Sequence, residues 1–210
     1  MHRSGLDLLA ELDRCARPVP PMVLSGQEGE HLIRLCYLAS AYESVYRGGP
    51  VDPGSPLSRA DADTTLPLLL DQVPDYALAD IGGQLELAAH REALGWTTES
   101  GRSPVCGPEF AGSADVGGAD ADLICDGELI DCKATVQPAR LGAREIRQLA
   151  GYLLLDYTDQ YQIRALSLYL SRQGATITWN TSEFLARLGA RRPLPQLREL
   201  LIDHLERQAA

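Results

Sequence analysis

Lysine is nearly absent from this sequence of 210 residues: Lys133 is the only one, and every other basic residue is arginine. Long hydrophobic runs are absent too, since the longest, such as residues 66–70, fall far short of the roughly 20 residues that span a bilayer. The first residues carry Arg3, Asp7 and Glu11 with no apolar run of signal-peptide length. We therefore expect a soluble, cytoplasmic protein with no membrane partner.

Cysteine and histidine do not form metal-binding patterns. The five cysteines are spread widely without a CxxC pair, and a zinc or iron–sulfur site needs four clustered ligands. In a cytoplasmic chain we expect these thiols to be reduced, small buried side chains. The four histidines show neither HxxxH nor HxH spacing, and the GxGxxG, Walker and GxSxG patterns are missing. These absences exclude the common nucleotide-binding loops and the serine-hydrolase elbow.

Charge is distributed unevenly along the chain. The net charge of −10 argues against a phosphate-rich partner for the molecule as a whole, because phosphate binding needs basic residues. Residues 1–132, however, hold 8 arginines against 22 acidic residues, a net −14, whereas residues 133–210 hold 11 basic and 7 acidic residues, a net +4. The C-terminal part can therefore offer a basic surface to a polyanion.

Hydrophobic periodicity predicts a helical first half and a mixed second half. The predicted helices of the first half cover 6–16, 28–47, 62–72 and 75–95. After a loop rich in glycine, serine and proline, the second half should contain a hairpin over 119–134, a helix over 142–157, strands near 163–171 and 175–179, and helices near 181–188 and 195–207. This order indicates an α/β or α+β fold with a central mixed sheet. We expect a helical region, 1–100, packed on a core, 101–210.

The most specific local signal is the dipeptide Asp126-Gly127, which favours a two-residue hairpin turn. Such a turn places Asp122 opposite Asp131, and the alternation of side chains then defines the two faces of the hairpin. The expected apolar face holds Ala121, Leu123, Ile130 and Cys132, and the expected polar face holds Asp120, Asp122, Asp131 and Lys133.

Two aspartates directly opposite each other are unfavourable in a purely structural hairpin. Aspartate is disfavoured in strands, and opposed like charges destabilise a sheet by about 0.2–1 kcal/mol. A divalent cation between Asp122 and Asp131 would reverse the sign of that interaction, and carboxylate oxygens suit Mg²⁺ or Mn²⁺. Lys133 points to the same side and could hold a water or stabilise negative charge. A solvated polar face is the competing interpretation.

These residues form a pattern that resembles a known superfamily. Asp122 followed by Asp131-Cys132-Lys133 is similar to the PD-(D/E)xK nuclease motif, with Ala121 where proline is usual. Downstream, Gln148-Leu-Ala-Gly-Tyr152 resembles the QxxxY motif of the RecB-like branch. The resemblance implies a restriction-endonuclease-like αβββαβ core over about residues 104 to 180, whose first helix comes from the N-terminal region.

The resemblance also implies roles for the hairpin residues. Asp122 and Asp131 would be metal ligands for Mg²⁺ or Mn²⁺, and the backbone carbonyl of Cys132 would add a third. Lys133 would position or activate the attacking water.

Further roles fall on helical residues. Gln148 and Tyr152 share a helix face and would contact the substrate backbone or brace the site, although an ordinary amphipathic helix would look the same. An acid from the first core helix often completes the metal shell in this superfamily. Glu43 is the candidate, with an ion pair to Arg47 as the alternative role, and Glu86 is a second choice.

Taken together, the sequence predicts a metal-dependent deoxyribonuclease that acts in DNA processing, repair or defence against foreign DNA, with RNA left open as a substrate. A homodimer or a partner protein would supply specificity, since no separate recognition domain is evident. Two alternatives remain: a catalytically silent nucleic-acid-binding or protein-interaction module with the same fold, and an acidic protein whose N-terminal helices bind a partner.

Overall fold

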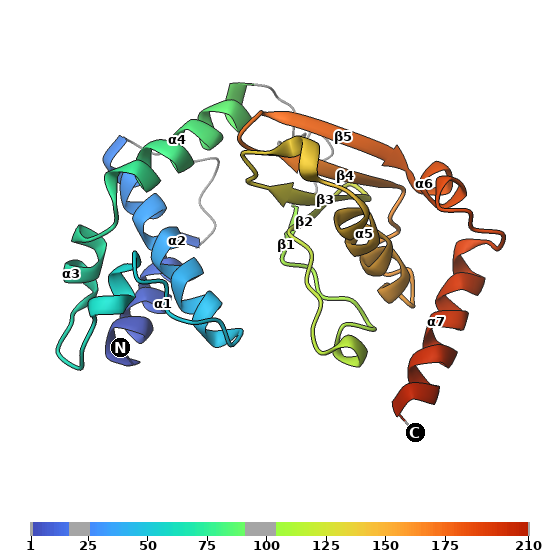
Figure 1. Ribbon diagram of the computed structural model, residues 1–210, viewed down its shortest axis with the longest axis horizontal. Helices are drawn as coiled ribbons and strands as arrows, with labels where there is room; N and C mark the ends of the chain where they lie inside the picture. The colour runs from blue at the N-terminus through green and yellow to red at the C-terminus, as the bar shows by residue number, and fades with distance from the viewer. Residues whose placement is uncertain (1, 17–25, 91–103, 210) are drawn as a thin grey trace. The chain divides into compact units, whose positions relative to one another are not determined.

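The computed structural model describes residues 2–16, 26–90 and 104–209 (Figure 1). The chain divides into two compact units, Met1–Gly83 and Gln84–Ala210. The boundary expected near residue 100 lies outside the described residues. No helix in the described ranges is long and apolar enough to cross a membrane.

Helices make up the first unit, as predicted. They are α1 (His2–Ala16), α2 (Gly26–Tyr46), α3 (Leu66–Asp71), the first part of α4 (Asp75–His90) and a short 3-10 helix (Pro56–Arg59). The helix predicted over 62–72 begins later, at Leu66. Asp61 explains the delay, because its Oδ1 accepts hydrogen bonds from the Asp63 N–H at 3.0 Å and the Thr64 hydroxyl at 2.6 Å. That local turn competes with the helix.

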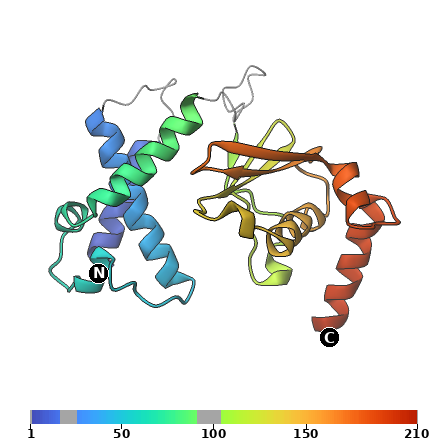
Figure 2. The ribbon, with the colours of Figure 1, turned by 45° about the horizontal axis from the view of Figure 1, so that its top comes forward.

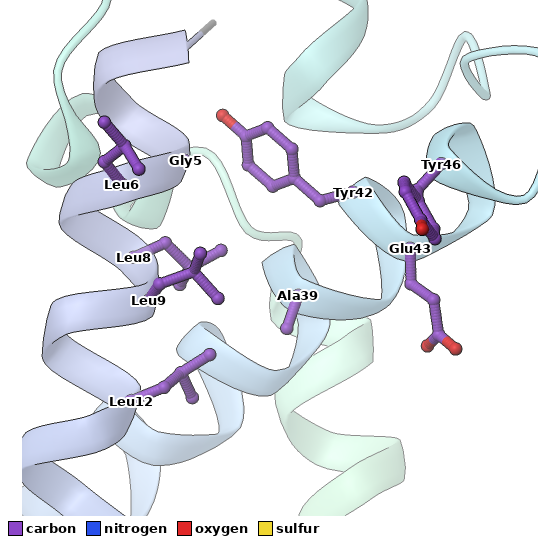
Figure 3. A pocket seen from close by; sticks show the side chains of 9 residues that line it. All are labelled: Gly5, Leu6, Leu8, Leu9, Leu12, Ala39, Tyr42, Glu43 and Tyr46. Carbon is purple, nitrogen blue, oxygen red and sulfur yellow. The ribbon is translucent and has the colours of Figure 1, made fainter. Parts of the chain in front are cut away.

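The first unit packs around leucines, with Leu35, Leu38 and Leu69 completely buried. An open apolar groove of about 720 Å³ runs between α1 and α2 (Figure 3). Leu6 and Leu9 of α1 contribute to it and remain 54% and 64% exposed. Leu8 of the same helix is buried, so only part of the apolar surface of α1 packs in the core of this unit.

The second unit is built on a five-stranded mixed sheet. Its strands are β1 (Val105–Cys106), β2 (Leu123–Cys125), β3 (Glu128–Lys133), β4 (Ala165–Leu170) and β5 (Ala175–Asn180), in the spatial order β1-β2-β3-β4-β5. β3 and β4 pair in parallel, and the other neighbours pair antiparallel. Its helices are α5 (Ala143–Leu155), α6 (Thr181–Arg187) and α7 (Leu194–Ala209), with the last part of α4. The expectation of a mixed α/β fold is confirmed.

Helix α5 is the crossover that joins the parallel strands β3 and β4, as such a connection requires. It lies on one face of the sheet (Figures 1 and 2). Leu149 and Leu153 of α5 are fully buried in a core with Leu129 of β3 and Leu166 of β4. On the other face, Leu123, Ile130 and Tyr169 form a smaller cluster. Ala88 of α4 packs against this second cluster.

The hairpin has the predicted turn and register. Asp126 and Gly127 have φ angles of 48° and 79°, and Leu123 pairs with Ile130. The prediction for Ala121 was wrong: it packs in the α5-side core rather than with Leu123 and Ile130. β2 begins only at Leu123, so strict alternation does not extend back to Ala121.

Arg198 of α7 is a buried basic residue of the second unit. It is only 4% exposed. Its Nη1 donates to Asp159 Oδ1 at 2.8 Å, its Nε donates to the Leu153 carbonyl at 3.2 Å, and its Nη2 lies 3.5 Å from the buried Asp156 Oδ2. This buried cation ties α7 to the end of α5.

Replacing Arg198 with alanine should therefore lower the free energy of unfolding by about 3–5 kcal/mol, because it leaves the buried Asp156 carboxylate without its cation. Urea denaturation followed by circular dichroism measures the change. The matched control is Arg187→Ala, which removes an exposed ion pair with Glu183 and should cost no more than about 0.5 kcal/mol. Equal effects of the two variants would contradict the structural role given to Arg198.

Candidate functional site

The site is built on β3, whose alternation sends Asp131 and Lys133 to the same side as Leu129, the side covered by α5. Asp131 is 2% exposed, so its carboxylate lies inside the protein. Lys133, at the end of the strand, is partly buried. A carboxylate is rarely buried unless it is paired with a cation or a metal.

One chain of contacts joins four of the residues that the sequence singled out. Lys133 Nζ lies 2.5 Å from Asp131 Oδ2. The same ammonium donates a hydrogen bond to Gln148 Oε1 at 2.9 Å. Gln148 Nε2 in turn donates to the Tyr152 hydroxyl at 2.7 Å. Hydrogen bonds thus connect the α5 stripe to the hairpin.

Asp122 sits just before β2 and occupies the end of the hairpin. Its backbone carbonyl accepts a hydrogen bond from Gly107 N–H at 3.0 Å, while its Oδ2 accepts from Cys132 N–H at 2.6 Å. The N–H and C=O of a residue in a strand point to the same neighbouring strand. The Cys132 carbonyl therefore faces the side on which Asp122 lies, which brings the predicted backbone ligand to the same edge.

Burial and neighbouring charges perturb the titration of this group of residues. Burial raises the pKa of Asp131, and the charges of Asp122 and Glu145 raise it further, whereas Lys133 lowers it. Burial, with the charges of Asp122 and Asp131, raises the pKa of the Cys132 thiol to about 11. The site is therefore a partly buried, electronegative cluster in which Lys133 is the cation that contacts Asp131.

The negative charges of the aspartates also affect a residue of α5. Burial raises the pKa of Tyr152, and the charges of Asp131, Asp122 and Asp120 add to that rise, against the hydrogen bond from Gln148. Asp120, from the polar face that the hairpin predicts, thus acts electrostatically on the same tyrosine.

Glu145 is a member of the site that the sequence analysis did not select. Its Oε2 accepts the N–H of Gly142 at 2.8 Å at the start of α5, and this hydrogen bond lowers its pKa. A glutamate three residues after the residue that precedes a helix is the usual signal of such a cap. That signal identifies Glu145 as a helix cap, but only the fold brings its charge near Asp131 and Lys133.

The two candidates for a further acidic ligand lie on helices. Glu43 belongs to α2 in the first unit, where its carboxylate forms a 2.8 Å ion pair with Arg47 and points away from the leucines of α1 (Figure 3). Glu86 lies on the part of α4 that belongs to the second unit, two residues before Ala88, which packs on the sheet. A metal-binding role for either residue stays a prediction.

The chemistry of the donors suits a hard cation bound by few protein groups. No cluster of three or more histidine, cysteine or acidic residues in the described ranges is arranged to hold a metal. Mg²⁺ does not need one, since it usually keeps several waters and binds through one or two carboxylates. Asp131 Oδ2 is buried and, although close to Lys133 Nζ, makes no well-aligned hydrogen bond. A metal would coordinate this oxygen in place of the Lys133 ammonium.

Comparisons with known proteins add no assignment: no protein-family model matches the chain, and no curated protein and no solved structure is detectably similar to it. The residues themselves therefore carry the functional argument.

Replacing Asp131 with asparagine should change how stability depends on pH. Because the pKa of Asp131 is raised above its ordinary value of 3.8, the folded protein binds more protons than the unfolded chain, and its stability falls as the pH rises through that interval. Asp131→Asn removes this loss, so its free energy of unfolding relative to the parent should increase from about pH 4 upward. Urea denaturation across the pH range measures the difference.

The control for this measurement is Asp203→Asn, which changes an exposed carboxylate on α7 in the same unit. Its stability curve should run parallel to that of the parent protein. Parallel curves for Asp131→Asn as well would show that the pKa of Asp131 is not raised.

Proposed function

We propose that the second unit is a metal-dependent nuclease that hydrolyses DNA phosphodiester bonds. The observation that carries the proposal is the contact chain from Asp131 through Lys133 and Gln148 to Tyr152. These are the residues of the two motifs that resemble the PD-(D/E)xK superfamily and its RecB-like branch. An unrelated amphipathic helix would have no reason to present Gln148 to the lysine of the hairpin.

The order of the elements gives further support. β1, β2 and β3 are followed by α5 and then by β4, parallel to β3, in agreement with the βββαβ part of the implied core. The end of α4, which precedes β1, packs on the opposite face of the sheet from α5. It supplies a candidate for the first core helix, and it carries Glu86 rather than Glu43.

The balance of charge also favours a cation. Lys133 contacts Asp131, but Asp122, Asp120 and Glu145 add three further carboxylates that act on Asp131 or Tyr152. Like charges in a partly buried region destabilise one another unless a counter-ion is present. Mg²⁺ or Mn²⁺ held by Asp122, Asp131 and the Cys132 carbonyl would provide that counter-ion.

The residues of the chain have separable roles in this scheme. A bound Mg²⁺ or Mn²⁺ supplies Lewis-acid polarisation of the phosphate and a more acidic water. Without a metal, the Lys133 ammonium pairs with Asp131; with a metal bound, it would stabilise negative charge that develops on a phosphate oxygen. Gln148 fixes the position of Lys133 through its amide oxygen, and Tyr152 fixes Gln148, so the α5 stripe sets the direction in which the ammonium points.

A second candidate is a nucleic-acid-binding module without turnover. One observation favours it: both aspartates already have partners within the protein, Asp122 the Cys132 N–H and Asp131 the Lys133 ammonium. These contacts explain how the pair persists without a metal. They do not explain why Gln148 and Tyr152 converge on the same lysine.

Lys133→Ala should reduce metal-dependent DNA cleavage by at least about 100-fold, the usual effect of removing one group that stabilises developing charge. The assay follows linear and circular DNA, single- and double-stranded, with Mg²⁺, with Mn²⁺ and with EDTA, and RNA serves as a parallel substrate. Because Lys133→Ala leaves Asp131 buried without its cation, Lys133→Met, which keeps the apolar stem, and Asp131→Asn are measured beside it, with folding checked by circular dichroism.

Arg191→Ala, an exposed arginine elsewhere in the second unit, serves as the control and should cleave like the parent. Cleavage that needs no added metal, or that survives in folded Lys133→Met and Asp131→Asn, would refute the proposed site. DNA binding without cleavage under every metal condition would favour the silent module.

A further inference from the structure

We propose that three arginines beside the site, Arg140, Arg144 and Arg147, form a strip that binds the phosphates of one nucleic-acid strand. The inference rests on the proposed function and adds to it the surface by which the substrate backbone is held. Arg140 ends the 3-10 helix Pro138–Arg140, and the other two lie in the first turns of α5.

All three side chains are exposed. None makes a hydrogen bond or ion pair with another described residue, although the charge of Arg144 contributes to the lowered pKa of Glu145. Arg187 differs from these three, because it pairs with Glu183 one turn away at 2.8 Å. Guanidinium groups without an internal partner keep their donors available for a ligand.

The strip is continuous with the site. Arg144, Gln148 and Tyr152 are four residues apart, so they follow one another along one face of α5. Gln148 binds Lys133, which places Arg144 one helical turn beyond the contact chain. Arg147, three residues after Arg144, is its neighbour on the helix surface, with Cβ atoms about 5–6 Å apart.

The positive charge of the strip would offset the negative charge of the site for an approaching phosphate. Asp120, Asp122, Asp131 and Glu145 would repel a phosphate that approaches the site, and repulsion at exposed positions extends over about 10 Å at 0.1 M salt. Between residues 133 and 155 the sequence holds four basic residues and only one acidic residue, in a chain whose net charge is −10. This segment runs from Lys133, the last residue of β3, to the end of α5, and it therefore includes Gln148 and Tyr152 of the site.

The chemistry of the strip favours a phosphodiester backbone as its ligand. Arginine presents a planar fork of donors that matches phosphate oxygens in a bidentate geometry. Several such forks along one edge suit a ligand with regularly repeated charges. Because the strip leads to carboxylates that suit a divalent cation, a nucleic-acid strand held there would bring a phosphodiester to the candidate metal site. An acidic peptide is also negatively charged, but it has no phosphodiester for a metal bound by those carboxylates to act on.

The test is nucleic-acid binding measured by fluorescence anisotropy in EDTA, where cleavage does not interfere. The variant Arg140→Gln/Arg144→Gln/Arg147→Gln is compared with Arg187→Gln/Arg191→Gln/Arg192→Gln, which removes the same charge from exposed positions of the same unit. We expect the first triple variant to bind labelled single-stranded DNA at least about 10-fold more weakly. Its slope of log K against log salt should fall by about 2, since each lost phosphate contact is worth about 0.7 on a single strand. The second triple variant should change affinity less than twofold.

Three outcomes would overturn the inference: no DNA binding by the parent chain, equal losses in the two triple variants, or displacement of DNA by poly-glutamate as effective as displacement by unlabelled DNA. Failure of the nuclease proposal gives a different result. If only the first triple variant loses DNA binding and the parent chain does not cleave DNA with any metal, the strip is supported as a phosphate-binding surface. The proposed catalytic role of the second unit is then refuted.

Discussion

The contact between the Lys133 ammonium and the Asp131 carboxylate is the interaction on which the candidate site depends. The ammonium neutralises a carboxylate that is 2% exposed, and it is held from the other side by the amide of Gln148. Without a cation at this point, Asp131 would be a buried charge with no compensation, which costs several kcal/mol. The hydrogen bond from the same ammonium to Gln148 joins β3 to α5, so Lys133 also links two elements of the core.

Several features of this arrangement could be predicted from the sequence. Asp126-Gly127 fixes the turn, the turn fixes the register, and the register brings Asp122 and Asp131 to the same end of the hairpin. The helical spacing of Gln148 and Tyr152 likewise predicts that they share one face of α5. Local signals succeed here because each acts over only a few residues.

Other features depend on tertiary structure and could not be read from local patterns. Ala121 changes faces because β2 begins only at Leu123, which no alternation rule reveals. Arg198 is buried because α7 packs beside the end of α5, where its guanidinium group pairs with Asp156 and Asp159. Glu145 carries an ordinary capping signal, and only the folding of α5 against the sheet makes its charge relevant to Asp131. The resemblance to the PD-(D/E)xK superfamily organises the remaining residues, and its catalytic meaning stays a proposal.

A crystal of the full chain soaked in Mn²⁺ tests the central claim most directly, because anomalous scattering locates the metal independently of activity. The account predicts a peak bound by a carboxylate oxygen of Asp122 and one of Asp131, at the roughly 2 Å typical of small hard cations, with the Lys133 ammonium displaced from Asp131 Oδ2. Absence of any peak there, with the 2.5 Å contact of Lys133 and Asp131 unchanged, would contradict it.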